Sequence, residues 1–192
     1  MQSFYEQFEY PNGIMGWLVG WLMAVETRER NAWAVSELHL RPTDNVLEIG
    51  FGPGSAIAEA AKTARFVAGV DHSAVMLHQA SNLNARAIRE GRVQLQRGTV
   101  EHLPYPTASF DKVFAVNSLQ IWPEKPAALQ EIRRVLKPDG RIHIFEQPFR
   151  GDPQEAAQKN FAALAEAGFK QLTITEKDMK PVATTCVQGV IG

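Results

Sequence analysis

Residues 46–55 read VLEIGFGPGS, and this stretch decides the fold. Its first four residues, 46–49, predict a buried strand, and the alanine-rich sequence that follows predicts a helix. Between them, Gly50, Gly52 and Gly54 form a GxGxG turn. Glycine lets the backbone turn sharply and approach a ligand that any Cβ would block. The order of strand, turn and helix therefore predicts a ligand-binding loop at the end of a strand.

A carboxylate follows the next strand. Asp71 closes the apolar run 66–70 and lies 21 residues after Gly50. In that place it can accept hydrogen bonds from both hydroxyls of a ribose beside the glycine turn. The alternative is an acid at a helix N-terminus that interacts with the helix dipole, worth about 0.3–1 kcal/mol. The pairing of Asp71 with the glycines favours the ribose, and hence an adenosine-bearing ligand.

The glycine spacing separates two classes of adenosine ligand. A pyrophosphate-binding turn has the pattern GxGxxG, but its third glycine position is Ser55 here. Glu48, two residues before Gly50, would repel a phosphate and attract an ammonium or sulfonium group. We therefore expect a cationic amino-acid moiety attached to adenosine, with an NAD-type oxidoreductase as the alternative.

Strand and helix patterns alternate along the rest of the chain. The expected strands are 46–49, 66–70, 93–96, 110–116 and 141–146. The expected helices are 55–63, one capped by Ser73 and stopped by Gly91, one marked by Leu129, Ile132 and Leu136, and one from Asp152 to Gly168. Two closing segments, 171–176 and 182–190, have no helix between them and should pair as a hairpin. We expect an α/β fold with a seven-stranded, mostly parallel sheet, one antiparallel strand and helices on both faces. Ligands should bind at the carboxyl ends of the strands.

The composition limits the classes of function. The chain has 192 residues, of which 45% are hydrophobic, enough for one domain with a core. Its formal net charge is -1 and it has no basic stripe, which argues against a nucleic-acid partner. The single cysteine, Cys186, excludes an intramolecular disulfide and a cysteine-rich zinc site. We expect no metal and a reducing, cytoplasmic compartment.

Residues 1–40 are expected to form a helical lid over the ligand site, packed on an α/β domain of residues 41–192. Residues 14–25 (IMGWLVGWLMAV) are an uninterrupted apolar run of 12, shorter than the roughly 20 that span a bilayer. No lysine or arginine precedes this run, unlike in a signal peptide. Beyond the run, helical spacing continues through Ala32, Val35 and Leu38.

Four segments resemble those of class I S-adenosylmethionine-dependent methyltransferases, of the small-molecule type related to quinone-biosynthesis enzymes. The segments read VLEIGFGPGSA, GVDHSAVML, RGTVEHLPYPTASFDKVFAVNSLQIW and EIRRVLKPDGRIHIFE. The resemblance implies the strand order 3-2-1-4-5-7-6 with the last strand antiparallel. It also implies S-adenosylmethionine as cofactor and methyl transfer to a small-molecule acceptor.

The same resemblance implies which residues hold the methionine part of the cofactor. Glu48 and the backbone of Gly50 would hold it directly, and Gly52 and Gly54 would allow its close approach. The backbone of Asn117, after the fourth strand, would contact the same moiety.

On the adenosine side, the resemblance implies that Asp71 binds the ribose and that His72 lies against one face of the adenine. The alternative for His72 is a partly exposed loop histidine. Thr99 and Val100 match the loop that meets the adenine edge. The family usually has aspartate at the position of Thr99, which would accept from the exocyclic amine. Here the Thr99 hydroxyl can accept without a charge, or Glu101 substitutes for the aspartate.

The acceptor is expected to be small and apolar or aromatic. Tyr5, Trp17, Gln120 and Trp122 are the candidates to bind it. The alternative for the aromatic residues is plain packing. No residue identifies itself as a general base, and the weak candidates are His72, His102, Tyr5 and Glu146. A non-catalytic S-adenosylmethionine-binding protein is therefore a further alternative, and either a monomer or a homodimer is expected.

Overall fold

The computed structural model describes residues 28–148 and 151–191. The expected helical lid, with the candidate residues Tyr5 and Trp17, lies outside these ranges. Within them, no helix is long and apolar enough to cross a bilayer.

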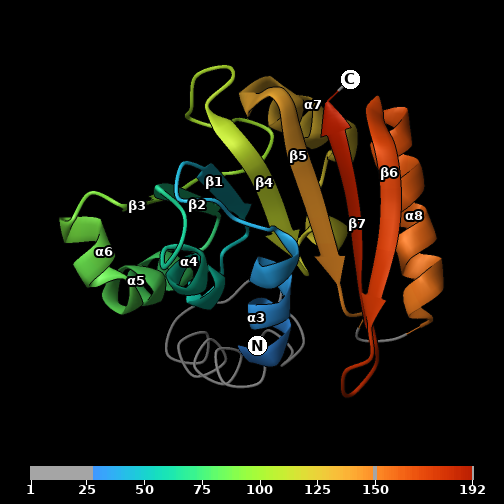
Figure 1. Ribbon diagram of the computed structural model, residues 1–192, viewed down its shortest axis with the longest axis horizontal. Coiled ribbons are helices and arrows are strands. Elements are labelled where there is room, and N and C mark those ends of the chain that lie inside the picture. The colour runs from blue at the N-terminus through green and yellow to red at the C-terminus, as the bar shows by residue number, and fades with distance from the viewer. Residues whose placement is uncertain (1–27, 149–150, 192) are drawn as a thin grey trace, which may run out of the picture.

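A seven-stranded sheet runs through the molecule in the order β3-β2-β1-β4-β5-β7-β6 (Figure 1). Its strands are β1 (Asn45–Ile49), β2 (Phe66–Asp71), β3 (Val93–Arg97), β4 (Phe110–Val116), β5 (Leu136–Glu146), β6 (Phe169–Lys177) and β7 (Thr184–Ile191). The first five strands pair in parallel, whereas β7 is antiparallel to both β5 and β6. The predicted strand order, the closing hairpin and the single reversed strand are confirmed.

Helices cover both faces of the sheet. They are α3 (Arg28–Glu37), α4 (Ser55–Ala60), α5 (Ala74–Leu83), α6 (Ala85–Arg89), the short 3-10 helix η1 (Leu119–Ile121), α7 (Lys125–Val135) and α8 (Pro153–Glu166). On one face, α3, α4 and α5 bury Trp33, Ile57 and Met76. On the other face, α7 and α8 bury Leu129 and Leu164.

The central strand β1 is buried on both faces, which explains its nearly continuous apolar sequence. Side chains alternate along a strand, so Leu47 and Ile49 pack on the side of α7 and Val46 on the side of α4. Glu48 points the same way as Val46, and its side chain is therefore buried beneath α4.

Both helix starts predicted from capping residues are confirmed. The Ser73 hydroxyl accepts a hydrogen bond from the backbone N–H of Met76 at 3.4 Å. The Asp152 carboxylate accepts one from the N–H of Gln154 at 2.9 Å. Each cap satisfies a backbone donor that has no partner inside its helix.

The helix that begins after Ser73 is interrupted, contrary to the prediction of one continuous helix. It divides at Asn84 into α5 and α6. The Asn84 side-chain amide donates to the carbonyls of Gly54 and Ala80 at 3.1 and 2.9 Å. An asparagine that bonds to nearby backbone in this way competes with regular helix geometry.

Two other boundaries differ from the prediction. Leu136 was expected to end a helix, but its backbone is extended and it begins β5 opposite Phe110. The helix expected to reach Thr63 ends at Ala60. The carbonyl of Ala60 accepts from the N–H groups of both Thr63 and Ala64, which closes the helix with a turn.

The buried face of α3 differs in part from the face that the spacing of Ala32, Val35 and Leu38 predicts. Trp33, Ala34 and Leu38 are buried, whereas Ala32 is exposed. The Trp33 ring packs edge-on against Phe145 of β5, with 5.5 Å between the ring centroids. Burial of a large aromatic surface outweighs that of an alanine, so the helix turns its tryptophan toward the sheet.

Close packing between α4 and α5 explains the glycine at position 54, and its replacement supports a stability prediction. Gly54 has φ of +85°, and a Cβ there would lie 2.6 Å from the Cβ of Ala80. Gly91 has a similar φ of +71° but no heavy atom within 4 Å of its Cβ position. We expect Gly91→Ala to cost about 1–2 kcal/mol of left-handed strain. Gly54→Ala should cost about 1–3 kcal/mol more, because of the clash. Equal losses in urea unfolding would contradict this explanation of Gly54.

Candidate functional site

The loops that follow the parallel strands meet at one edge of the sheet, because parallel strands carry their carboxyl ends to the same side. Figure 1 shows the arrowheads of β4 and β5 at the end of the sheet where α3 lies. The residues gathered at this edge are the glycine loop 50–54, Asp71 and His72, the loop 98–102, Asn117 and Gln147.

Asp71 connects the end of β2 to the glycine loop. Its Oδ2 accepts a hydrogen bond from the N–H of Gly52 at 2.9 Å, and its Oδ1 accepts one from Ser73 at 2.8 Å. The side chain is only 6% exposed. Burial raises the pKa of Asp71, while the Ser73 and Gly52 amides and then His72 oppose that rise. Each carboxylate oxygen can accept a further hydrogen bond, so the group can hold the loop and still receive a ligand hydroxyl.

The three glycines of the loop meet different surroundings. A Cβ on Gly50 would lie 2.6 Å from the Cβ of Ser118, so the close neighbour there is a protein side chain. Gly54 packs against α5, as described above. Gly52 has φ of +52°, and no atom of the described residues lies within 4 Å of its Cβ position. The open space is therefore at Gly52, beside Asp71, and this is where a ligand can approach the backbone.

Glu48 lies beneath the loop as a buried acid. It is 2% exposed, and its Oε2 has no hydrogen-bond partner in the described parts of the chain. Burial raises the pKa of Glu48 well above its ordinary value, the negative charge of Asp71 raises it further, and a bond from the Ile57 amide opposes the rise. An oxygen buried without a partner costs about 1–3 kcal/mol, so a ligand donor would relieve a real cost.

Arg30 of α3 is a half-buried cation at the same edge, and the sequence analysis did not single it out. Its Nη1 donates to the Gln147 side chain at 3.3 Å, and its buried Nε has no hydrogen-bond partner among the described residues. Burial lowers the pKa of Arg30 from 12.5 to about 10, so the group stays charged at neutral pH. Its neighbour Asn31 donates to the Ser55 hydroxyl at 2.7 Å, which holds α3 beside the glycine loop.

Gln147, after β5, joins three parts of the site, and the sequence analysis did not identify it either. Its backbone N–H donates to the Asn117 side chain at 2.7 Å, and its own carbonyl accepts from the same amide group at 3.2 Å. Its side-chain amide donates to the carbonyls of Lys180 and Val182, in the connection between β6 and β7. Asn117 has a left-handed backbone with φ of +51°. Its side chain therefore positions the loop after β5, and its carbonyl accepts from Gln120 at 2.9 Å.

The loop after β3 contains three residues that were expected to contact the adenine, and they differ in exposure. Thr99 is exposed, whereas Val100 is buried in the core. The side chain of Glu101 has one buried oxygen, Oε1, that no described residue hydrogen-bonds. His72, after β2, is 37% exposed, with its Nδ1 3.8 Å from Asp71.

The acceptor and general-base candidates are less well placed. Trp122 is 7% exposed and packs in the core on the side of α7, which is the packing alternative given above. The Glu146 carboxylate accepts from Asn160 of α8 at 2.6 Å, and His102 is exposed. In the described ranges, no three His, Cys, Asp or Glu side chains are grouped so that they could hold a metal ion.

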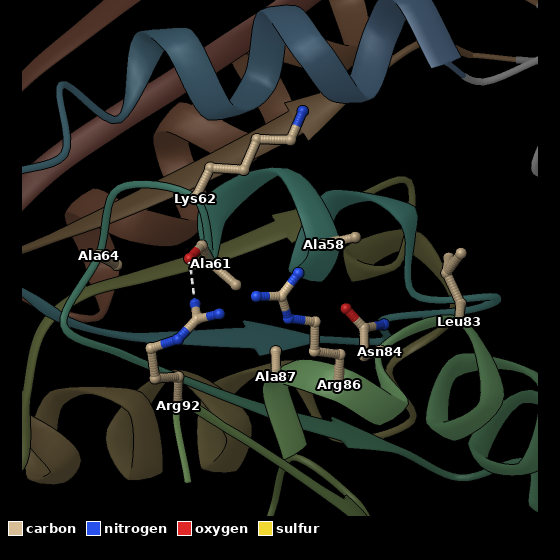
Figure 2. Close-up of a pocket in the computed structure, with 9 residues that line it drawn as sticks. All are labelled: Ala58, Ala61, Lys62, Ala64, Leu83, Asn84, Arg86, Ala87 and Arg92. Carbon is tan, nitrogen blue, oxygen red and sulfur yellow. Dashed lines mark hydrogen bonds between the residues drawn. The ribbon is translucent and has the colours of Figure 1, made fainter. Parts of the chain in front are cut away.

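A hollow of about 580 Å³ lies between α4 and the α5–α6 region and contains none of the predicted site residues (Figure 2). Its cationic side chains already have partners. Lys62 pairs with Glu59, and Arg86 and Arg92 both pair with Glu90. Arg92 also donates to the carbonyl of Ala61, as the dashed line in Figure 2 shows. Each of these cations therefore already has an acidic partner, although Arg86 and Arg92 share Glu90.

Comparison with known proteins places the chain in a family. Residues 47–144 match the model of a family described as "Methyltransferase domain". The chain is 34% identical over 176 residues to the uncharacterized methyltransferase YdaC of Bacillus subtilis, covering 88% of this chain and 95% of that protein.

Other proteins match this chain over a smaller part of its length or are similar to it in fold alone. The ubiquinone/menaquinone biosynthesis C-methyltransferase UbiE of Geotalea daltonii is 30% identical over 122 residues, which is 62% of this chain and 52% of that enzyme. This chain therefore aligns with only about half the length of that relative. A SAM-dependent methyltransferase from Aquifex aeolicus has the same fold, with a TM-score of 0.70 and 20% identity over 84% of this chain and 89% of that one.

The buried Glu48 supports a pH prediction. Because its pKa is raised in the folded protein, the folded state keeps the proton more tightly than the unfolded chain, whose value is near 4.5. Stability linked to that proton is present at low pH and is lost as the pH rises above that value. Glu48→Gln cannot titrate, so the stability of the wild type relative to this variant should fall between pH 4.5 and 8.

Urea unfolding across this pH range measures the difference. Glu166→Gln, which removes an exposed carboxylate at the end of α8, is the control and should run parallel to the wild type. A constant difference between wild type and Glu48→Gln would show that Glu48 is not held protonated.

Proposed function

This chain belongs to the S-adenosylmethionine-dependent methyltransferases, and from that membership we propose that it methylates a small, apolar or aromatic acceptor. It is an enzyme, and its cofactor is S-adenosylmethionine. The observation that carries the proposal for the cofactor site is the pair formed by Gly52 and Asp71. A glycine with open space beside it is held against a buried carboxylate that can still accept from a ribose. The similarity to an enzyme named as a quinone-biosynthesis methyltransferase supports a small-molecule acceptor.

At the methionine end, we assign opposite roles to Glu48 and Arg30. The methionine moiety carries an ammonium and a carboxylate. The edge of the sheet holds a buried acid and a half-buried cation, each with a buried atom that no described residue hydrogen-bonds. A positive group near Glu48 would favour its ionised form, and a negative group near Arg30 would compensate its buried charge. The backbones of Gly50 and Asn117 would bind the same moiety.

At the adenosine end, Asp71 would bind the ribose and His72 would lie against the adenine. Gly52 would leave room for this approach, Gly54 would act through the packing of α4 on α5, and Val100 would support the adenine from the core. The exposed Thr99 lacks a charge, whereas Glu101 has a buried oxygen that receives no hydrogen bond from the described residues. We therefore favour Glu101 over Thr99 as the acceptor for the exocyclic amine.

The chemistry at this edge is mainly positioning. The bound cofactor supplies a methyl group that is activated by its positive sulfur. Gln147 and Asn117 fix the loops where an acceptor would lie, and α3 covers part of the edge, which limits access of water. Gln120, Tyr5 and Trp17 would contact the acceptor. An acceptor that is already ionised needs no general base, and we assign none.

Binding and turnover measurements test the proposal. Calorimetric titration should show binding of S-adenosylmethionine and S-adenosylhomocysteine but not of NAD, and mass spectrometry should detect a methylated product in a panel of quinols and phenols. Asp71→Asn should weaken S-adenosylhomocysteine binding about 10- to 100-fold, because a hydrogen bond to a charged group is lost. The control Asp139→Asn changes an exposed acid at the opposite edge and should bind normally.

A negative result in the binding measurement and one in the turnover measurement would contradict different parts of the proposal. Retention of NAD with no response to the sulfonium compound would contradict the cofactor assignment. Tight S-adenosylmethionine binding with no product across the panel would favour the non-catalytic alternative.

The Arg30 assignment has its own test. Arg30→Met should weaken binding of S-adenosylhomocysteine about tenfold or more, because the ligand carboxylate loses its counter-charge. Binding of 5′-methylthioadenosine, which lacks the amino-acid part, should change less than about twofold. Arg28→Met removes an exposed arginine of the same helix and serves as the control. Equal losses for both ligands would indicate displacement of α3 and would contradict the charge argument.

A further inference from the structure

A second cavity, of about 520 Å³, lies at the opposite edge of the sheet, where β4 and β5 begin. Its wall includes the loop after α3, the first residues of both strands and Gln188 of β7. Its charged lining consists of four cationic side chains (Arg41, Lys112, Lys137 and Arg141) and two acidic ones (Asp111 and Asp139), and His39 and His143 also line it. None of the residues assigned to the cofactor lies in this wall.

The strand register crowds positive groups on one face of the sheet. Lys112 of β4 and Arg141 of β5 are direct neighbours across the two strands. His143 follows Arg141 by two residues and so points to the same face, where Gln188 is its neighbour on β7. Like charges side by side in a sheet are unfavourable unless another group compensates them.

The acids nearby compensate only part of this charge. The Lys112 ammonium is 7% exposed, and it donates to Asp44 at 2.8 Å and to the carbonyl of His39 at 3.0 Å. Its third N–H has no acceptor among the described residues, although an ammonium has three donors. Lys137 pairs with Asp111, but Arg141 has no acidic partner in the described ranges.

His143 adds an unsatisfied group to the same wall. It is 1% exposed, and its Nδ1 has no hydrogen-bond partner in the described parts of the chain, while the Gln188 side chain bonds the ring. Burial, and after it the charges of Lys112 and Arg141, lower the pKa of His143 to about 3, so the ring is neutral at physiological pH. The same charges would favour an anion.

We propose that this cavity binds a phosphate group, either free or as the monoester of a small molecule. Its oxygens would accept from Lys112 and Arg141, and its hydroxyl or an accompanying water would meet Nδ1 of His143. A water molecule alone could satisfy the histidine but would supply no negative charge beside the neighbouring Lys112 and Arg141. The hollow of Figure 2 differs in that each of its cations is already paired.

Histidine ring resonances can locate the binding. The chain has five histidines, of which His39 and His143 line the cavity while the other three do not. Inorganic phosphate is titrated into the whole protein, with and without saturating S-adenosylhomocysteine, and compared with sodium chloride at matched ionic strength. We expect phosphate, but not chloride, to shift the ring resonances of His39 and His143 in a saturable way. S-adenosylhomocysteine should not change these shifts. The control resonance is His78, on α5.

A matched pair of variants tests the charge argument. Arg141→Gln should raise the phosphate dissociation constant at least tenfold. Arg86→Gln removes an arginine of the Figure 2 hollow and should change it less than about twofold. Titration with glycerol 3-phosphate distinguishes the two possible ligands. Tighter binding than that of inorganic phosphate indicates a phosphate monoester, and weaker binding indicates the free ion.

Three outcomes would overturn the proposal. They are equal shifts with chloride, competition by S-adenosylhomocysteine, and an unchanged dissociation constant in Arg141→Gln. Because the titration also runs without the cofactor product, a failure of the methyltransferase assignment would leave this result interpretable.

Discussion

The hydrogen bond from the Gly52 N–H to the Asp71 carboxylate is the contact on which the proposed cofactor site depends. This site lies where the parallel strands have their carboxyl ends, at what we call the cofactor edge of the sheet. It joins the loop after β1 to the end of β2 and fixes the one loop glycine that has open space beside it. The adjacent bond from the Gly50 N–H to the carbonyl of Val70, at 2.7 Å, holds the same two strand ends together. One carboxylate therefore shapes the backbone and remains available to a ribose, which only an oxygen with several acceptor positions can do.

The two edges of the sheet handle buried charge in different ways. At the cofactor edge, Glu48 and Arg30 each have an atom without a hydrogen-bond partner in residues 28–148 and 151–191, so this part of the chain leaves the edge electrostatically incomplete. At the other edge, Lys112 and Asp44 form a buried pair at 2.8 Å, and Asp44 also accepts from Arg41. A complete pair stabilises the fold, whereas an incomplete one costs stability that a zwitterionic ligand can return. The cofactor edge therefore suits a zwitterion, whereas the opposite edge, where Arg141 has no acidic partner among the described residues, suits an anion.

The roles of individual residues depended on what packs around them. The three loop glycines look equivalent in sequence, yet Gly50 faces Ser118 and Gly54 faces Ala80, whereas no described residue lies beside the Cβ position of Gly52. Trp122 looks like an acceptor-binding aromatic but packs in the core. Arg30 stands in the charged stretch ETRERN, where nothing distinguishes the one arginine that α3 turns toward Gln147. Each distinction comes from a neighbour far away in the chain.

The amino-acid sequence by itself determined the strand–helix alternation, the capped starts at Ser73 and Asp152, the glycine loop and its partner Asp71. These features depend on local periodicity, on capping chemistry and on spacing along one chain, all of which are visible in the sequence. The tertiary structure decided which loop glycine has open space beside it in the described part of the chain, that Arg30 turns toward Gln147, and that Lys112 and Arg141 lie side by side. Those facts depend on strand register and helix rotation, which the whole set of packing contacts fixes together and which no short segment encodes.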